Sequence, residues 1–408
     1  DLIEGAADEL AHIGVHENGT PLAFGSLVYG TAPADWFRYY AGWADKIEGR
    51  TVPVMPNDSL NYTIHEPFGV VAVLTAFNAP MSFLGMKVAP ALAAGNAVVI
   101  KPSELAPFST IRFAELCIEA GMPPGLVNVV TGLGDVGSAL VRHQGVDKVT
   151  FTGGVSTARS ILGDLAPLVR PAVLELGGKS AALLFNDGDL DAAVTTVMQN
   201  GVAMLAGQAC VAPTRLLVQR DRYDEAVELA GEIAESIQVG DPADTGTLMG
   251  PLISASSQER VLNVIQQTVA DGAGRLVYGG NRVGGTLAQG FFIEPTIFAD
   301  VEPSSAVAQH EIFGPVLCII PFDREEDAIR IANGTKYGLA GYVYTNDISR
   351  AHRCAAALRA GYLSINSFNI FPPAAPFGGY GQSGLGREGG QEGLLEMLQT
   401  KNVFLPLS

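Results

Sequence analysis

The stretch Gly69-Val70-Val71-Ala72-Val73-Leu74-Thr75-Ala76-Phe77-Asn78-Ala79-Pro80 decides the fold class of this 408-residue chain. Its continuous apolar run, residues 70–75, has the character of a strand that is buried on both faces. Similar strands are predicted at 97–100, 127–130 and 148–151, and they alternate with helix-length segments at 83–94, 107–119, 135–143 and 156–167. Near-continuous Val/Ile/Leu strands separated by helices predict a parallel sheet that is covered on both faces.

A second series of strands and helices follows Gly178. Its predicted strands are 181–185, 215–218 and 316–321, and its predicted helices lie near 189–200, 222–237, 255–270, 325–333 and 348–359. This series has the size of a second α/β domain with its own sheet, which a chain of this length accommodates. Ligands bind at the carboxyl ends of the strands in such sheets, so the segments after the strands are the candidates for function.

Three further segments are predicted to lie outside the regular strand–helix units. In residues 49–67 apolar and polar side chains alternate, which predicts two strands that lie outside the core sheet. The short apolar strand 401–405 has no obvious partner in its own chain, so both segments could extend the sheet of another subunit. The tail 366–388 is rich in Gly, Pro and Phe, and we expect its loops to close over a site.

The composition argues against disorder and against several kinds of binding partner. A hydrophobic share of 48% and a charged share of 16% argue against disorder. The net charge of −17 disfavours nucleic acid and anionic membranes, because phosphate binding needs clustered lysines and arginines. The longest apolar run, 88–100, is too short to span a bilayer. Four scattered cysteines show neither metal-ligand nor disulfide spacing, so we expect no metal site and a reducing, cytoplasmic setting.

Two short stretches carry candidate catalytic groups. In Gly207-Gln208-Ala209-Cys210 a Gly-Gln turn presents a thiol, and Glu175 closes an apolar run as a carboxylate at a strand end. A cysteine and a glutamate can serve as nucleophile and general base. Taken singly, Glu175 is equally well a strand-end salt-bridge partner and Cys210 a small buried hydrophobe. The other cysteines, Cys117, Cys318 and Cys354, are predicted to be inert core residues.

Two glycine-containing turns are candidates for phosphate binding. Gly132-Leu133-Gly134-Asp135-Val136-Gly137 matches a dinucleotide fingerprint, but it follows the third strand of its series and lacks the acidic residue expected at the end of the next strand. We therefore interpret it as a tight strand–helix turn. Phe151-Thr152-Gly153-Gly154 is the better candidate, because it ends a strand and opens a helix whose free N–H groups can face a pyrophosphate.

Seven motifs in order resemble those of the aldehyde dehydrogenase superfamily, and the resemblance covers nearly the whole chain. They are Phe77-Asn78-Ala79-Pro80, Lys101-Pro102-Ser103-Glu104, Phe151-Thr152-Gly153, Glu175-Leu176-Gly177-Gly178-Lys179, Gly207-Gln208-Ala209-Cys210, Glu311-Ile312-Phe313-Gly314-Pro315 and Pro376-Phe377-Gly378-Gly379. The resemblance implies an NAD-dependent, non-acylating enzyme that oxidises an aldehyde to a carboxylic acid. Members carry several tens more N-terminal residues, so we expect this chain to be truncated.

The fold implied by the resemblance is α/β with two Rossmann-like domains and a small β arm. The NAD-binding domain is expected to comprise residues 1–48 and 68–177, and the catalytic domain residues 178–378. Residues 49–67 and 395–405 are expected to form an oligomerisation arm. By analogy with the family we expect a homodimer or a homotetramer.

The resemblance also assigns chemical roles. Cys210 is implied as the nucleophile that attacks the aldehyde carbon, and the Asn78 amide and the Cys210 N–H are implied to hold the oxyanion. Glu175 is implied to activate the water that hydrolyses the thioester, and its apolar neighbours should raise its pKa toward neutrality. Acylating relatives generally lack this glutamate. Lys87 and Glu388 match proton-relay positions, with plain surface charges as the alternative.

The implied cofactor site consists of Lys101, Ser103, Glu104, Phe151, Gly153, Gly154, Leu176, Glu311 and Phe313. Lys101 and Glu104 would hold the adenine ribose, and the carboxylate would repel a 2′-phosphate, so NAD is favoured over NADP. Glu311 would grip the nicotinamide ribose. The implied substrate tunnel consists of Phe77, Met81, Phe83, Met86, Ala209, Val211, Phe368 and Phe371. Because this set contains no Arg or Lys, an apolar aliphatic or aromatic aldehyde is favoured.

Four residues depart from the family pattern at positions that should affect the affinity for the cofactor and the shape of the substrate pocket. Gly154 stands in place of a common serine, Leu205 of an asparagine, Gly381 of a lysine and Phe77 of a tryptophan. Two alternatives stay open: a semialdehyde dehydrogenase, and a non-catalytic NAD-binding or structural member of the same fold. The joint retention of nucleophile, base and oxyanion donor argues against the second.

Overall fold

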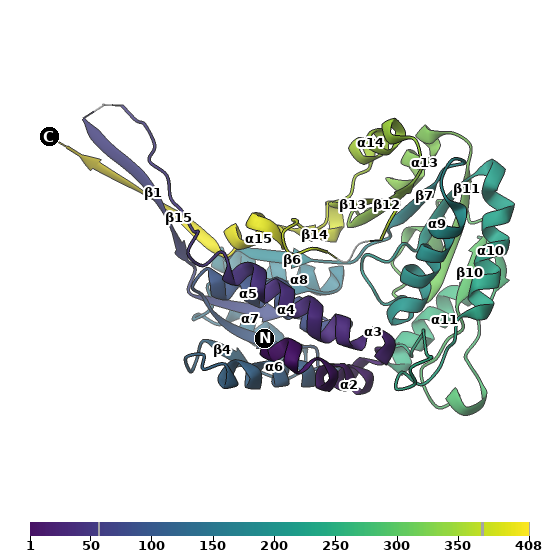
Figure 1. The fold of residues 1–408 in the computed structure, drawn as a ribbon, viewed down its shortest axis with the longest axis horizontal. Coiled ribbons are helices and arrows are strands. Elements are labelled where there is room, and N and C mark those ends of the chain that lie inside the picture. The colour runs from purple at the N-terminus through teal and green to yellow at the C-terminus, as the bar shows by residue number, and fades with distance from the viewer. Residues whose placement is uncertain (56–57, 369–370, 408) are drawn as a thin grey trace.

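Three sheets organise the computed structural model, which describes residues 1–55, 58–368 and 371–407 (Figure 1). Two of the sheets are large and mainly parallel with helices packed on them, and the third is a two-stranded ribbon. The α/β fold with two Rossmann-like units and a small arm is therefore as predicted. Residues 56–57 of the predicted arm and 369–370 of the predicted tail lie outside the described residues.

The first large sheet has the strand order β14-β6-β5-β2-β3-β4. Its parallel strands are β2 (Val70–Leu74), β3 (Ala97–Lys101), β4 (Val127–Val129), β5 (Lys148–Thr152) and β6 (Ala172–Glu175), while β14 (Gly384–Leu385) runs antiparallel to β6. The chain starts the sheet at β2, moves outward through β3 and β4, and then returns to β5 on the other side. This reversal of strand order leaves a crevice at the carboxyl ends of β2 and β5, where such folds bind ligands.

Helices cover both faces of this sheet. They are α5 (Pro80–Ala93), α6 (Phe108–Glu119), α7 (Gly134–Arg142) and α8 (Val155–Leu165), preceded by α2 (Ala7–Asn18) and α4 (Ala32–Ala41). On β2, Val71 and Val73 belong to the core cluster that contains α5, whereas Ala72 and Leu74 belong to a separate cluster with α7 and α8. Successive side chains point to opposite faces of a strand, so this division shows why β2 is apolar throughout.

The second large sheet has the order β13-β12-β7-β8-β11-β10-β9. Its strands are β7 (Ala181–Leu184), β8 (Arg215–Gln219), β9 (Arg275–Tyr278), β10 (Thr296–Ala299), β11 (Val316–Phe322), β12 (Ala340–Tyr344) and β13 (Tyr362–Ile365). Its main helices are α9 (Leu190–Met198), α10 (Tyr223–Ser236), α11 (Ala255–Ala270), α13 (Glu325–Ala332) and α14 (Ile348–Ala357).

The sequence predicted only β7, β8 and β11 of this sheet. The four missed strands have four or five residues each. Length alone does not distinguish them from β7 and β8, which have four and five residues and were predicted. The strand geometry of the missed segments depends on pairing with neighbouring strands.

The third sheet is a ribbon that projects from the body of the molecule (Figure 1). It pairs β1 (Ser59–Pro67) with β15 (Leu398–Pro406) along their full length in antiparallel register. The prediction that 401–405 has no partner in its own chain was therefore wrong, because the partner lies more than 300 positions away in the sequence. Residues 49–67 were predicted to contain two strands. The second of these is β1, and the segment before it contributes an isolated bridge between Thr51 and Tyr62.

No helix in the described ranges combines the length and the apolar character that crossing a membrane requires.

Candidate active site

Glu175 is the last residue of β6, and its side chain is buried at the carboxyl edge of the first sheet. The strand continues into two glycines that other groups approach closely. A Cβ atom at Gly177 would lie 2.0 Å from Glu311 Oε2, and one at Gly178 would lie 2.5 Å from the Cys210 carbonyl oxygen. The Gly178 N–H donates to Glu311 Oε1 at 3.1 Å. The glycine pair is thus the feature that lets β6, Glu311 and the Cys210 segment meet.

Cys210 lies in the connection between α9 and β8. The helix changes to a π-helical turn at Gln199–Ala203 and then to the turn Met204–Gly207, in which Leu205, Ala206 and Gly207 have φ angles of 52°, 51° and 70°. Left-handed backbone is unfavourable for Leu and Ala. A Cβ at Gly207 would lie 2.2 Å from the Gly314 carbonyl oxygen, so glycine is required there for space as well.

Asn78 connects the first sheet to this turn. It lies between β2 and α5, two residues before the helix begins at Pro80, and its Nδ2 donates to the Gln208 carbonyl oxygen at 2.9 Å. The Gln208 side chain holds the turn from the other side, since its Oε1 accepts from the Ile253 N–H at 3.0 Å and its Nε2 donates to the Leu205 carbonyl at 2.9 Å. An amide NH₂ has two donor hydrogens, so Asn78 keeps one for an oxyanion.

The electrostatic surroundings disfavour charge on both reactive groups. Burial, together with the carboxylates of Glu175 and Glu311, raises the pKa of the Cys210 thiol well above its ordinary value of 9.0. Burial and Glu388 raise the pKa of Glu175 well above 4.5, against opposing effects of Lys87 and Arg387. The thiol therefore needs a base, and a carboxylate of raised proton affinity can accept a proton near neutral pH.

Lys87 and Glu388 form a buried ion pair. Their side chains are 0% and 2% exposed, and the Lys87 ammonium contacts Glu388 Oε1 and donates to Thr150 Oγ1 at 3.2 Å. The alternative that they are plain surface charges is therefore wrong. Glu388 Oε2 and Glu175 Oε1 have no hydrogen-bond partner within the described parts of the chain. Unpaired buried oxygens of this kind require an explanation, and a role in moving protons is one.

Two adjoining cavities contain most of the predicted site. The first, of about 250 Å³, is lined by residues that include Asn78, Glu175, Leu176, Cys210, Glu311 and Phe313. The second, of about 380 Å³, is lined by residues that include Lys101, Ser103, Glu104 and Phe151. Both cavities share Ala76, Phe77, Thr152, Gly153 and Gly154. Every one of the nine predicted cofactor residues thus lines one cavity or both.

The structure adds residues that the sequence did not indicate. Arg260 on α11 lines the first cavity, and its guanidinium donates to the Ile312 carbonyl oxygen. Nothing in the sequence distinguished it from other charged residues on a helix. Gly134 and Gly137 line the second cavity, so the fingerprint-like motif borders the site in addition to forming a strand–helix turn.

The predicted tunnel residues are only partly gathered at the cavities. Phe77 lines both, whereas Met81, Phe83 and Met86 of α5 are buried in the core. Ala209 and Val211 flank Cys210, and Val211 is buried. Phe368 stacks on Tyr342 with ring centroids 5.4 Å apart, and Phe371 meets Tyr362 edge to face at 5.2 Å. The tunnel role of all eight residues stays a prediction.

Relatives of the chain were identified by sequence and by structure. Residues 1–403 match the aldehyde dehydrogenase family. A betaine aldehyde dehydrogenase of Cereibacter sphaeroides is 42% identical over 405 residues, which is 99% of this chain and 82% of the relative. A crystal structure of betaine aldehyde dehydrogenase from Staphylococcus aureus in complex with NAD⁺ has a TM-score of 0.97 at 36% identity, covering 100% of this chain and 82% of that one.

An NAD⁺ complex of an aldehyde dehydrogenase from Bacillus cereus is equally similar, with a TM-score of 0.97 at 40% identity and the same coverage. The family match spans nearly the full sequence, and the structural similarity covers the whole chain. The chain therefore belongs to the aldehyde dehydrogenase family, as its seven motifs predict.

Proposed function

We propose that this enzyme oxidises an apolar aldehyde to the carboxylic acid with NAD, through a thioester on Cys210 that is hydrolysed rather than passed to another acceptor. The observation that carries the proposal is the position of Cys210 and Glu175 in one cavity that continues past Phe77 to Lys101 and Glu104. A thiol and a base in one cavity and groups suited to a ribose in the adjoining one match the chemistry of a dinucleotide.

The residues along the cavities fit such a cofactor. The helix α8 begins at Val155 without a side-chain cap, so its first N–H groups are free to bind a pyrophosphate beside Gly153 and Gly154. The hydroxyl of Thr152 at the same strand end is buried and has no partner among the described residues. Relatives with this architecture have been crystallised with NAD⁺. When bound, NAD supplies the acceptor for hydride.

The chain's own groups account for the remaining steps. The Cys210 thiol gives up its proton to a water molecule and its sulfur attacks the aldehyde carbon, while one amide hydrogen of Asn78 stabilises the developing oxyanion. Once hydride has left, water attacks the thioester and the acid is released as the sulfur leaves as a thiolate, which takes up a proton from water to restore the thiol. Glu175 takes the proton of the attacking water molecule. Lys87 and Glu388 lie buried on the path by which that proton can leave.

Cofactor preference is expected to depend on Glu104, which pairs with Lys101 at 3.3 Å at the edge of the second cavity. Glu104→Gln removes the charge that would repel a 2′-phosphate, so kcat/KM with NADP relative to NAD should rise about tenfold or more. Steady-state kinetics with both cofactors measure this ratio, with Glu228→Gln on α10 as a control outside the cavities. An unchanged ratio would assign the preference to other residues.

The substrate class is tested by following NADH at 340 nm over a panel of aldehydes. Aliphatic and aromatic aldehydes should be turned over with higher kcat/KM than carboxylate-bearing semialdehydes, because Phe77 faces the first cavity beside the thiol. Betaine aldehyde is a second candidate, since several relatives are named for it and aromatic rings bind quaternary ammonium groups. A clear preference for a semialdehyde would contradict the apolar assignment.

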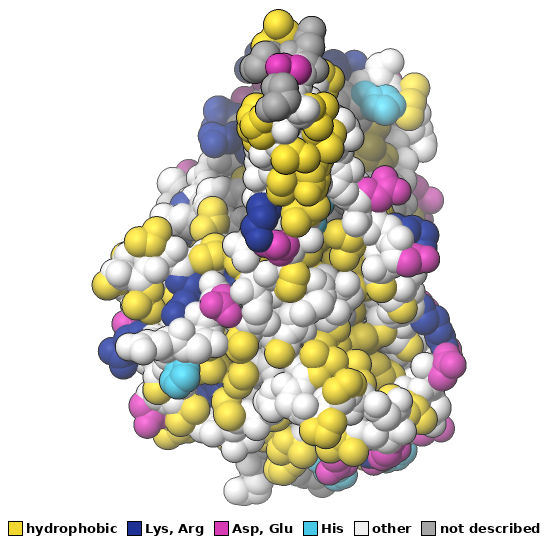
Figure 2. Space-filling view, turned by 90° about the vertical axis from the view of Figure 1, so that its left-hand side faces the viewer, with side chains coloured by type: hydrophobic (Ala, Val, Ile, Leu, Met, Phe, Trp, Pro, Cys, Tyr) yellow, Lys and Arg dark blue, Asp and Glu magenta, His cyan; other side chains and the backbone are white. Residues whose placement is uncertain are grey.

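We infer that the ribbon of β1 and β15 joins two copies of the chain. One face of the ribbon carries apolar side chains at alternate positions of both strands, namely Leu60, Tyr62, Ile64, Val403 and Leu405 (Figure 2). Leu60 and Ile64 are 37% exposed and Leu405 is 50% exposed. An apolar face on a projecting ribbon is typical of an interface.

Leu405→Asp is therefore expected to convert the assembly to monomers, because it places a charge in the apolar face. Light scattering coupled to size-exclusion chromatography measures the mass, and Thr400→Asp, in the same strand but on the opposite face, serves as the control. An assembly of unchanged mass in Leu405→Asp would show that copies associate elsewhere. The cytoplasmic setting stays a prediction.

A further inference from the structure

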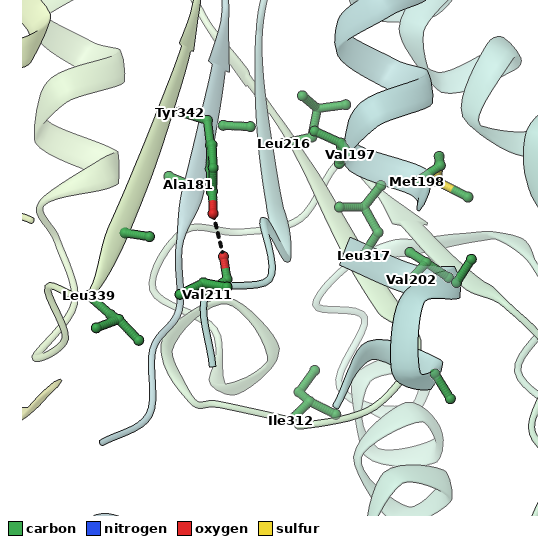
Figure 3. Packing of buried hydrophobic residues seen from close by; sticks show 14 of the residues in the cluster. Ala181, Val197, Met198, Val202, Val211, Leu216, Ile312, Leu317, Leu339 and Tyr342 are labelled. Carbon is green, nitrogen blue, oxygen red and sulfur yellow. Dashed lines mark hydrogen bonds between the residues drawn. The ribbon is translucent and has the colours of Figure 1, made fainter. Parts of the chain in front are cut away.

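We propose that Tyr342 is a positioning residue for the nucleophile, and that its hydroxyl fixes the Cys210 turn through the Val211 carbonyl. Tyr342 lies on β12 in the second sheet, far in sequence from the turn, and its hydroxyl donates to the Val211 oxygen at 2.9 Å (Figure 3). Its side chain is 1% exposed. A role in placing the thiol rests on the proposed function of Cys210.

The turn is held at two carbonyls, one on each side of the cysteine. Asn78 donates to the Gln208 oxygen, two residues before Cys210, and Tyr342 donates to the Val211 oxygen, one residue after it. Asn78 follows β2, which belongs to the six-stranded sheet. Tyr342 lies on β12 of the seven-stranded sheet, which also contains β8, the strand that follows the turn. The cysteine is thus fixed relative to both sheets.

External fixing is needed because the turn is strained. Leu205 and Ala206 adopt left-handed backbone, which is unfavourable for residues with a Cβ atom, and such conformations persist only where surrounding contacts enforce them. Within the turn, the Ala212 N–H donates to the Ala209 oxygen at 3.1 Å. That bond spans Cys210 without tying it to either sheet.

The Tyr342 ring is itself kept in place, and its hydroxyl remains a donor. The ring stacks on half-buried Phe368 at an interplanar angle of 19°. Burial and the neighbouring Tyr362 and Cys210 raise the pKa of Tyr342 well above 10.0, so the hydroxyl keeps its proton across the working pH range. Phenylalanine at this position would preserve the stack and the packing but leave the buried Val211 oxygen without its donor.

The test compares Tyr342→Phe with Tyr344→Phe, a buried tyrosine two residues along the same strand whose hydroxyl has no hydrogen-bond partner within the described residues. Hydrogen–deuterium exchange of residues 205–214 reports the turn directly and needs no turnover. We expect exchange there to accelerate about tenfold in Tyr342→Phe and to match the unmodified enzyme in Tyr344→Phe. Equal exchange in both variants would overturn the proposal.

A second measurement addresses the chemistry. In a single turnover, Tyr342→Phe should form NADH about 10–100-fold more slowly, because misplacement of a reacting atom by about 1 Å costs on the order of 100-fold. Alkylation of Cys210 by iodoacetamide needs no defined aldehyde geometry, so its pH midpoint should not move. A moved midpoint would mean that Tyr342 tunes the acidity of the thiol, which contradicts a positioning role.

The two measurements separate this proposal from the proposed function. If the unmodified enzyme forms no NADH with any aldehyde while exchange in the turn still accelerates in Tyr342→Phe, the proposed function fails and the structural role of Tyr342 stands. If the enzyme turns over normally and Tyr342→Phe matches it in both exchange and single-turnover rate, the positioning role fails alone.

Discussion

Cys210→Ala is expected to lower kcat for aldehyde oxidation by about 10⁴-fold or more, since removing a covalent nucleophile eliminates the thioester pathway. The cysteine lines the first cavity and is absent from the lining of the second, which contains Lys101 and Glu104. Affinity for NAD should therefore stay within about twofold of the unmodified enzyme. The smaller alanine side chain fits in the space of the cysteine side chain, so the substitution should leave the shape of the cofactor site unchanged.

The measurement combines NADH formation at 340 nm with calorimetric titration of NAD. Cys117→Ala provides the control, since Cys117 is buried on α6 outside both cavities, and this variant should retain turnover. Turnover by Cys210→Ala at the rate of the unmodified enzyme would refute the assignment of the nucleophile. Loss of both turnover and NAD binding would instead point to a collapsed site.

Glu175→Gln is expected to separate the two halves of the reaction. A glutamine cannot take a proton from water, so the thioester should accumulate and steady-state kcat should fall about 10²–10⁴-fold. Rapid mixing should show a burst that approaches one NADH per active site, followed by slow turnover. If the burst disappears as well, Glu175 is needed to deprotonate Cys210 before attack, and a water-activating role alone is insufficient.

The pH dependence of the unmodified enzyme tests the same carboxylate. Burial and Glu388 raise the pKa of Glu175 above 4.5, and only the deprotonated carboxylate can accept a proton. Activity should therefore be present above the raised pKa and be lost as pH falls through it, with a midpoint above 4.5. This acidic limb should be absent from the residual activity of Glu175→Gln. Loss of activity at the ordinary pKa of a carboxyl group would show that Glu175 is no longer buried once the substrates are bound.

Much of the fold and of the site could be predicted because the determinants are local. The strand β2 is apolar at every position since both of its faces are covered, and this pattern is visible without any neighbour. Glu175 and Asn78 each follow an apolar strand, and the ends of parallel strands meet at one edge of a sheet. The resemblance supplied the roles, and the predicted cofactor residues line the two cavities.

Other features arise from contacts that no local pattern encodes. Lys87 and Glu388 pair across 301 positions, and β1 and β15 pair across more than 300. Arg260 reaches the cavity from a helix of the second sheet, and its sequence neighbours give no sign of this. The short strands of the second sheet were missed because pairing, not their own side-chain pattern, stabilises them.

By itself, the sequence determined the fold class, because apolar strands alternate with helices along the chain. It also predicted the nucleophile, the base and the oxyanion donor, because each is a residue type at the end of a strand or in a turn that matches a motif of the family. The tertiary structure decided which charges are buried, which strands pair and which hydroxyl holds the Cys210 turn. Those properties depend on distances between segments that are remote in the chain. Tyr342 shows the difference, since in the sequence it is one more apolar-looking residue of a short strand, and only folding brings it to Val211.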